Sequence, residues 1–213
     1  MYKYLLFDLD GTLTDPGLGI TNSVMYALRK FNINVEERAS LHKFIGPPLR
    51  HSFETFYGFS GEKSELAVQY YREYFKSHGL CENEVYDGIE DLLTQLKERG
   101  KSLIVATSKP ECFAIEILQH FNLYGYFDFV AGATMDETRN KKSDIIKYAL
   151  DSCNIYDKSS AIMIGDREHD IIGAKENELD SLGVLFGYGS YDELNGVGAT
   201  FIAERPMDIL EYV

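Results

Sequence analysis

The decisive stretch is Tyr4-Leu5-Leu6-Phe7-Asp8-Leu9-Asp10-Gly11-Thr12, an apolar run that ends in two carboxylates one residue apart. The apolar residues predict a buried strand, and because strand side chains alternate between faces, Asp8 and Asp10 would project to the same side. Two anions held this close repel each other, so they require a cation, a shared proton or solvent between them. Gly11 can turn the chain away immediately. Acidic Asp-Gly turns are common in loops, so other strand ends must show whether this one is a site.

Composition narrows the class of protein. The chain has 213 residues, of which 45% are hydrophobic, and this predicts a folded protein with a sizeable core. The net charge of −13, without a cluster of Lys or Arg, disfavours nucleic acid as a partner. Cys81, Cys112 and Cys153 form no disulfide or zinc pattern. Nothing resembles a signal peptide or a membrane-spanning run, so we expect a cytoplasmic protein without a membrane partner.

The hydrophobic periodicity divides the chain into three pieces. After the first strand, residues 17–79 have a helical pattern, which Gly46-Pro47-Pro48 breaks into two helix pairs. From residue 86 onward, helices alternate with short apolar strands, and this is typical of parallel βαβ units. The expected strands are 102–106, 127–131, 161–164, 181–186 and 200–203. The expected helices are 89–99, 111–121, 143–153, 170–177 and 206–212.

This order predicts the α/β class: a Rossmann-like parallel sheet with helices on both faces, and an inserted α-helical cap domain. We expect residues 1–15 and 82–213 to form one discontinuous core, and residues 16–81 to form the cap. Ligands of open α/β sheets bind beyond the carboxyl ends of the strands, where Asp8 and Asp10 would lie. The cap begins within a few residues of them, where it could act as a lid.

Two further strand ends carry groups suited to an anion. Thr107 and Ser108 follow the apolar run 103–106, and they offer hydroxyls and backbone N–H groups at the start of a helix. A simple helix cap explains the same residues. Lys141 and Lys142 precede the helix at 143–153, where the helix dipole opposes a cation, and this suggests a task such as meeting a phosphate. Two exposed lysines are the alternative.

The strand expected at 161–164 ends in Gly165-Asp166-Arg167-Glu168-His169-Asp170. If a helix begins near Arg167, Asp166 and Asp170 can face one location. Hard oxygen ligands of this kind suit Mg²⁺. No second His or Cys accompanies His169, so we interpret it as surface or loop support rather than as a ligand.

Together these stretches resemble the haloacid dehalogenase superfamily, and in particular its C1-capped, phosphoglycolate phosphatase-like branch. Residues 8–12 are similar to its first motif, Thr107 to its second, Lys142 to its third, and residues 165–170 to its fourth. The resemblance covers essentially the whole chain. It implies a Mg²⁺-dependent phosphatase that acts on a small phosphorylated metabolite, with phosphoglycolate or a nucleoside monophosphate as the nearest candidates.

The resemblance also implies a role for each site residue. Asp8 would be the nucleophile that forms an aspartyl-phosphate, and Asp10 the general acid and base. Mg²⁺ would be held by Asp8, Asp166 and a backbone carbonyl, that of Leu9 or of Asp10, with Asp170 supporting the ion or its waters. Lys141 remains an alternative to Lys142. The implied phosphate-binding residues are Asp8, Leu9, Asp10, Thr107, Ser108 and Lys142.

The sequence departs from the usual pattern of the branch at Ser108, where Asn is frequent, and at Ser143, where Pro is frequent. Gly46, Pro47 and Arg50 of the cap are the expected specificity residues, although an Arg50 in contact with solvent alone is an equal alternative. A phosphomutase would share the same machinery, but Thr12 is more typical of the phosphatases. A non-catalytic binding protein is the third alternative. The oligomeric state is not predicted.

Overall fold

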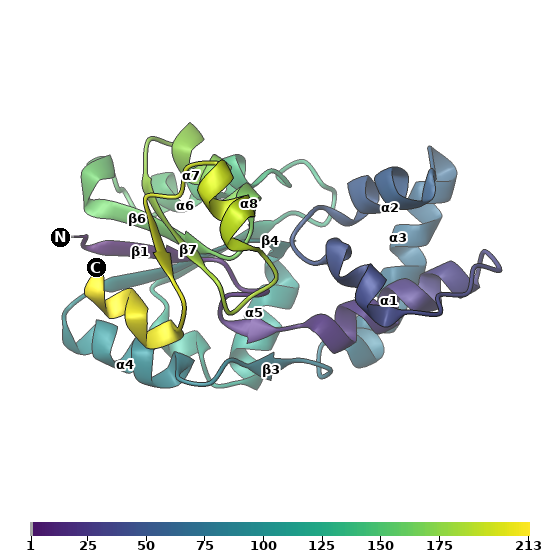
Figure 1. Cartoon of the computed structure of the whole chain (residues 1–213), viewed down its shortest axis with the longest axis horizontal. Coiled ribbons are helices and arrows are strands. Elements are labelled where there is room, and N and C mark those ends of the chain that lie inside the picture. Colours follow the sequence, from purple (N-terminus) through teal and green to yellow (C-terminus); the bar gives the residue numbers. More distant parts are fainter. Residues whose placement is uncertain (1) are drawn as a thin grey trace. The chain divides into compact units, whose positions relative to one another are not determined.

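The computed structural model describes residues 2–213, which form two compact units (Figure 1). The core unit contains the chain up to Thr14 together with Val85–Val213, and the helical unit is Asp15–Glu84. Both changes of unit fall within two short strands that pair with each other, β2 (Thr14–Asp15) and β3 (Glu84–Val85). No helix of residues 2–213 is long and apolar enough to cross a membrane.

The core unit contains a six-stranded sheet in the order β5-β4-β1-β6-β7-β8, and all its pairings are parallel. The first strand of the sequence lies in the middle, so Phe7 pairs with Val105 on one side and with Ile164 on the other. A central parallel strand is covered on both faces, which is why residues 5–7 form an unbroken apolar run. The strands are β1 (Tyr4–Phe7), β4 (Ser102–Pro110), β5 (Phe129–Ala133), β6 (Ala161–Gly165), β7 (Asp180–Val184) and β8 (Phe201–Ala203).

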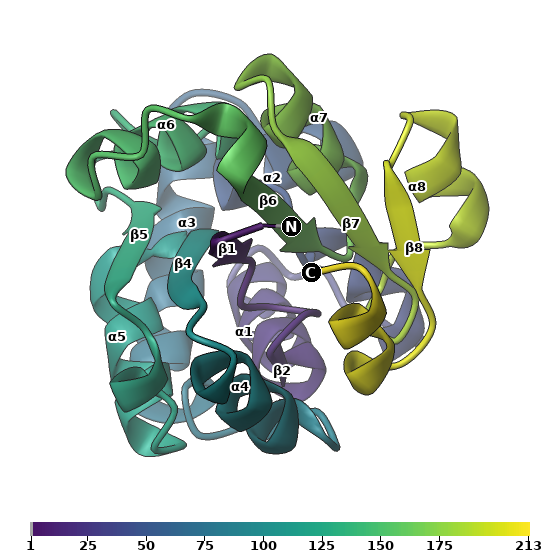
Figure 2. The ribbon, with the colours of Figure 1, turned by 90° about the vertical axis from the view of Figure 1, so that its left-hand side faces the viewer.

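Helices cover both faces of this sheet, so the predicted fold class is confirmed (Figure 2). The two helices that precede β4 and β5 pack on one face, and those that precede β6 and β7 pack on the other. Each presents an apolar stripe to the sheet; in the first of them, Ile89, Leu92, Leu93 and Leu96 are completely buried. The helices are α4 (Ile89–Glu98), α5 (Glu111–His120), α6 (Lys142–Ser152) and α7 (Glu168–Glu176).

A hydrophobic cluster lies between the sheet and α6 and α7. Leu6, Ile104 and Met163 are completely buried in it, with Ile145 and Ile146 from α6. Burying side chains of this size stabilises the fold by roughly 1.5–3 kcal/mol each. The same packing holds the carboxyl ends of β1, β4 and β6 side by side, and the candidate site lies there.

The helical unit consists of helices throughout, and its residues 16–83 contain no strand. Gly46-Pro47-Pro48 separates a 3-10 helix from an α-helix, as Pro dictates. In the last α-helix, Ala67, Val68 and Tyr71 form the buried face, whereas Leu66 is 38% exposed. The elements are α1 (Gly17–Arg29), η1 (Arg38–Phe44), α2 (Leu49–Tyr57), α3 (Glu62–Tyr74) and the π-helical η2 (Phe75–Gly79).

Several short elements differ from the sequence-based prediction. A six-residue helix, α8 (Tyr191–Gly196), follows β7 and was not predicted. The closing helix expected at 206–212 is a 3-10 helix, η5 (Pro206–Glu211). Two further 3-10 turns, η3 (Tyr124–Tyr126) and η4 (Lys158–Ser160), precede β5 and β6. Elements this short cannot display a full hydrophobic period, so periodicity does not detect them.

Candidate active site

Asp8 and Asp10 follow β1 directly, and both are buried. The Asp8 backbone N–H donates to the Ile164 carbonyl at 2.9 Å, which extends the pairing of β1 with β6 by one residue. The chain then turns at Gly11, whose φ is 81°, and the Leu9 carbonyl accepts the N–H groups of residues 12, 13 and 14 at 2.9–3.3 Å. Because three donors already occupy the Leu9 carbonyl, Asp10 is the better backbone candidate for a metal ligand.

Lys142 lies beside Asp8. Its Nζ is 2.9 Å from Asp8 Oδ1 and 2.7 Å from Asp170 Oδ1, and it donates to the Ala106 carbonyl at 3.0 Å. Burial opposes the charge on this lysine, but Asp170 and Asp8 outweigh it and raise the Lys142 pKa. Lys142 is therefore a cation throughout the physiological range. Its neighbour Lys141 is exposed, so the geometry distinguishes two lysines between which the sequence could not decide.

Asp10 is paired with a different lysine, Lys109, which sequence reasoning did not single out. Lys109 Nζ lies 2.7 Å from Asp10 Oδ2, and only 4% of the lysine side chain and 11% of the aspartate side chain are exposed. Burial raises the Asp10 pKa, although Lys109 acts in the opposite direction. Thr107 is buried two residues before Lys109 and accepts the Lys109 N–H at 3.3 Å, whereas Ser108 between them is half-buried. Strand alternation places Lys109 on the same side as Thr107, but it does not show that the lysine meets Asp10.

Asp166 is enclosed by backbone. Its Oδ2 accepts the Tyr188 N–H at 2.8 Å, whereas its Oδ1 is buried without a hydrogen-bond partner among residues 2–213. A Cβ on Gly11 or on Gly187 would collide with the carboxylate, and one on Gly189 would collide with the Asp166 carbonyl. These close approaches require glycine. The sequence signal for the missed loop was Gly187-Tyr188-Gly189, two glycines shortly after a strand.

The carboxylates of Asp8, Asp166 and Asp170 fit a divalent cation. Each offers an oxygen, and the three oxygens lie within 4.8 Å of one another. With Asp10, four buried carboxylates face two buried lysines, which leaves two negative charges uncompensated. Burial, followed by the charges of Asp170 and Asp8, raises the Asp166 pKa well above its usual range. A cation would remove this penalty, and hard carboxylate oxygens are the ligands that Mg²⁺ prefers.

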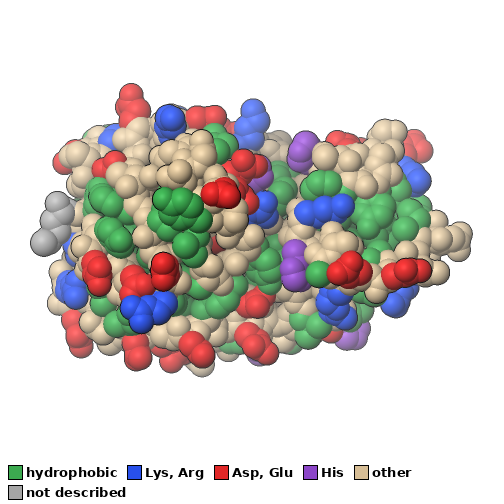
Figure 3. Space-filling view, in the orientation of Figure 1, with side chains coloured by type: hydrophobic (Ala, Val, Ile, Leu, Met, Phe, Trp, Pro, Cys, Tyr) green, Lys and Arg blue, Asp and Glu red, His purple; other side chains and the backbone are tan. Residues whose placement is uncertain are grey.

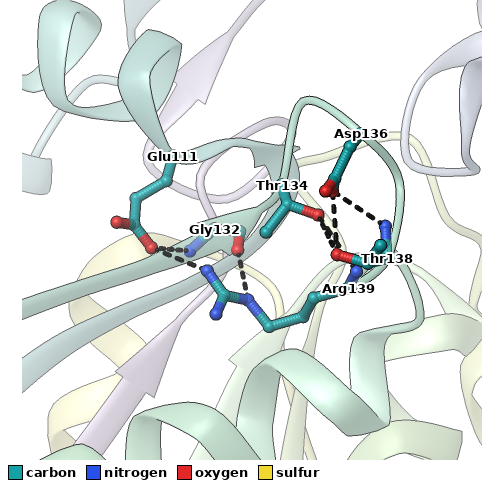
Figure 4. A network of polar contacts seen from close by, with 6 residues as sticks. All are labelled: Glu111, Gly132, Thr134, Asp136, Thr138 and Arg139. Carbon is teal, nitrogen blue, oxygen red and sulfur yellow. Dashed lines mark hydrogen bonds and ion pairs between the residues drawn. The ribbon is translucent and has the colours of Figure 1, made fainter.

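A polar network fixes the loop that leads to Lys142 (Figure 4). Arg139 Nε donates to the Gly132 carbonyl at 3.0 Å, and Arg139 Nη2 donates to Glu111 Oε2 at 3.1 Å. The same Glu111 oxygen accepts the Gly132 N–H at 3.2 Å. The Arg139 guanidinium also lies 3.7 Å from the ring centre of Tyr148 on α6. This network connects the end of β5 to the start of α5 and to the middle of α6, and it fixes Arg139, three residues before Lys142.

The expected specificity residues belong to the helical unit. Gly46, Pro47 and Arg50 are all half-buried, and Gly46 adopts a φ of 103°. Arg50 forms an ion pair with Glu65 at 3.1 Å, so the alternative that it contacts solvent alone was wrong. Their role in specificity stays a prediction.

The visible surface is mixed in charge. Lys and Arg side chains lie scattered among Asp and Glu in Figure 3, and they do not gather into one positive area. This agrees with the net charge of −13.

Comparison with known proteins gives concordant matches. A family model described as haloacid dehalogenase-like hydrolase matches residues 5–184. A 5′-nucleotidase of Pseudomonas aeruginosa is 48% identical over 91% of this chain and 87% of its own length. The tyrosine-protein kinase PtkA of Mycobacterium tuberculosis is 36% identical over 94% of this chain and 68% of its own length. The crystal structure of a predicted phosphatase from Clostridium acetobutylicum superimposes with a TM-score of 0.96 at 52% identity, covering 99% of both chains.

Proposed function

This chain belongs to the haloacid dehalogenase-like hydrolases and is an enzyme of their phosphatase type, and from that premise we propose that it hydrolyses a small phosphomonoester with Mg²⁺ through an aspartyl-phosphate on Asp8. One observation carries the proposal. Asp8 lies at the end of the central strand, paired with Lys142 and within 4.8 Å of the Asp166 and Asp170 oxygens, and Asp10 is held separately by Lys109. This arrangement supports a nucleophile and a proton carrier with distinct environments.

In the first step, an Asp8 oxygen attacks phosphorus as the bond from phosphorus to the leaving oxygen breaks. The leaving oxygen takes a proton from Asp10. In the second step, Asp10 accepts a proton from water as the water oxygen attacks phosphorus, and this releases inorganic phosphate and restores the Asp8 carboxylate. Lys142 and the Thr107 hydroxyl, with the backbone N–H groups of residues 9 and 10 and the Ser108 hydroxyl, would hold the phosphoryl oxygens during both steps.

The cation would be held by Asp8, Asp166 and the Asp10 carbonyl, with Asp170 supporting its position. When bound, Mg²⁺ neutralises the charge that otherwise keeps the Asp8 carboxylate and the phosphate apart. Lys142, 2.9 Å from Asp8 and 2.7 Å from Asp170, reduces the same repulsion, and it counteracts the burial that raises the Asp170 pKa to about 6.

The substrate class that the comparisons favour is a nucleoside 5′-monophosphate, because the 48% identical relative is named a 5′-nucleotidase. Phosphoglycolate is the second candidate, since a phosphoglycolate phosphatase of Colwellia psychrerythraea is 28% identical over 92% of this chain. In this fold the core performs the chemistry and the inserted domain selects the substrate. We therefore assign the choice between them to Gly46, Pro47 and Arg50 of the helical unit.

The test is phosphate release from a panel of phosphomonoesters, with and without Mg²⁺, using Asp8→Asn as the inactive control. Nucleoside 5′-monophosphates should be turned over fastest, and both omission of Mg²⁺ and Asp8→Asn should abolish release. Full activity in Asp8→Asn would contradict the mechanism.

Two other outcomes would replace the proposal. Transfer of phosphate from ATP to a tyrosine-containing protein, without net hydrolysis of monoesters, would favour the activity for which PtkA is named. Isomerisation of a sugar phosphate without phosphate release would indicate a mutase.

A further inference from the structure

Lys109 is a buried lysine at the carboxyl end of β4, and its ammonium faces a carboxylate of the site. Its Nζ is 2.7 Å from Asp10 Oδ2, and both side chains are almost completely buried. The β4 strand is irregular here, because its register against β5 shifts between Thr107 and Pro110. Thr107 and Lys109 remain on one side, joined by the hydrogen bond from the Lys109 N–H to the Thr107 hydroxyl. The irregular end of β4 thus places the Lys109 ammonium next to the Asp10 carboxylate.

Stability alone does not explain such a pair. Removing two charges from water costs several kcal/mol per ion, and apolar residues of similar volume often stabilise a fold as well or better. Lys101, the residue before β4 begins, is also buried, but its Nζ donates to the Tyr2 carbonyl at 2.7 Å and is paired with no carboxylate of the site. One strand therefore has a buried lysine at each end, and only the one at the carboxyl end is paired with a group of the site.

The two oxygens of Asp10 have different environments. Oδ2 is paired with Lys109, whereas Oδ1 is buried and has no hydrogen-bond partner among residues 2–213. A buried oxygen without a hydrogen bond destabilises the fold unless a ligand or a water molecule donates to it. The pairing at Oδ2 restricts rotation of the carboxylate, so the other oxygen keeps a fixed direction.

We propose that Lys109 is a positioning residue that holds Asp10 by Oδ2, so that Oδ1 is the oxygen that exchanges a proton with the leaving group and then with water. This inference rests on the proposed phosphatase function and assigns its proton transfer to one atom. Lys109 itself neither bonds to phosphorus nor moves a proton.

The experiment measures kcat/KM for a series of para-substituted phenyl phosphates, which share a shape and differ in the basicity of the leaving oxygen. A weakly basic nitrophenolate departs without a proton, whereas a phenolate needs one, so only the latter depends on Asp10. Since kcat/KM reports steps up to leaving-group departure, it isolates the acid role. In Lys109→Met, we expect the loss for phenyl phosphate to exceed that for p-nitrophenyl phosphate by roughly tenfold or more. Asp10→Asn should show the same pattern more steeply.

Lys101→Met is the matched control. It removes a buried lysine from the other end of β4, so it should lower the melting temperature while the ratio of the two kcat/KM values stays at the wild-type value. If Lys109→Met does not fold, Lys109→Gln, which retains a hydrogen-bond donor, takes its place in the same comparison. Equal losses for both substrates in the Lys109 variant, or the selective loss in Lys101→Met, would overturn the positioning role. Absence of phosphate release from every ester by the wild-type protein would overturn the proposed function first, and the inference with it.

Discussion

The two ends of the central sheet use polar residues in opposite ways. At the amino end, Asp128 accepts hydrogen bonds from Ser102 at 2.6 Å and from Lys97 at 3.0 Å, and Tyr2 donates to Asp180 at 2.7 Å. These groups are partly exposed and have partners. At the carboxyl end, the carboxylates are buried, outnumber the lysines, and include oxygens such as Asp166 Oδ1 without a hydrogen-bond partner among residues 2–213.

The difference shows which end contributes stability and which end opposes it. Exposed, satisfied hydrogen bonds contribute modestly to folding. Buried carboxylates close to one another oppose folding and persist only because the surrounding structure holds them in place. If this comparison is correct, substitutions at the carboxyl end should abolish function without unfolding the protein, whereas those at the amino end should lower its stability modestly and leave function intact.

The largest effect is expected for Asp8→Asn. Loss of the nucleophile should lower kcat by roughly 10⁴-fold or more. The same change removes one charge from four crowded carboxylates, and Lys142 keeps its partner Asp170, so without metal the variant should be about 1 kcal/mol more stable than wild type. Phosphate release and urea denaturation measure the two effects. A less stable variant would show that the carboxyl end contributes to folding after all.

A smaller effect is expected for Gly187→Ala. A Cβ at this position would lie 2.5 Å from Asp166 Cβ and collide with the Gly11 carbonyl, so Asp166 must shift. Displacing a ligand in this way should weaken metal affinity by about 10- to 100-fold. Titration with Mn²⁺, followed by electron paramagnetic resonance, measures this without relying on activity.

Gly196→Ala is the control for that substitution. Gly196 is the last residue of α8, and a Cβ there would meet nothing within 4 Å. The Mn²⁺ affinity of Gly196→Ala should equal that of the wild type. A wild-type Mn²⁺ affinity in Gly187→Ala would contradict the inference that the glycines position Asp166.

The smallest effect is expected for Asp128→Asn at the amino end. Burial tends to raise the Asp128 pKa, but hydrogen bonds from Ser102 and Lys97 outweigh it and hold the pKa below its usual 3.8. A lowered folded-state pKa stabilises the protein above the usual value, and that stabilisation disappears as the pH falls through the folded-state pKa. The aspartate is partly exposed, so solvent screening limits the loss at neutral pH to about 1 kcal/mol or less.

Denaturation at several pH values, together with kcat, checks this prediction. The stability difference between Asp128→Asn and wild type should shrink steadily below pH 4, and kcat should stay within about twofold of wild type. A pH-independent difference would show that the charge of Asp128 does not contribute.

The sheet and its site could be predicted from the sequence only where a local pattern, such as an apolar run followed by polar residues, indicates them. Residues 4–7 and 161–164 are continuous apolar runs that must be buried strands, and the polar residues after them identify the edge of the sheet where they meet. Lys109 and the Gly187-Tyr188-Gly189 loop were missed because their importance comes from what approaches them in space. A lysine two residues after Thr107 has the same local pattern whether it faces Asp10 or solvent. Likewise, the separation of Gly187 and Asp166 in the sequence does not show that they are in contact.

The central place of β1 has a consequence for synthesis. Phe7 pairs with Val105 and with Ile164, so β1 is synthesised long before the two strands with which it pairs. At about 5–20 residues per second, the ribosome needs on the order of 10–30 s between residues 7 and 164. During that interval Asp8 has neither Lys142 nor Asp166 beside it, and an apolar strand lacks its partners. The candidate nucleophile is therefore made early, but its site is complete only near the end of translation.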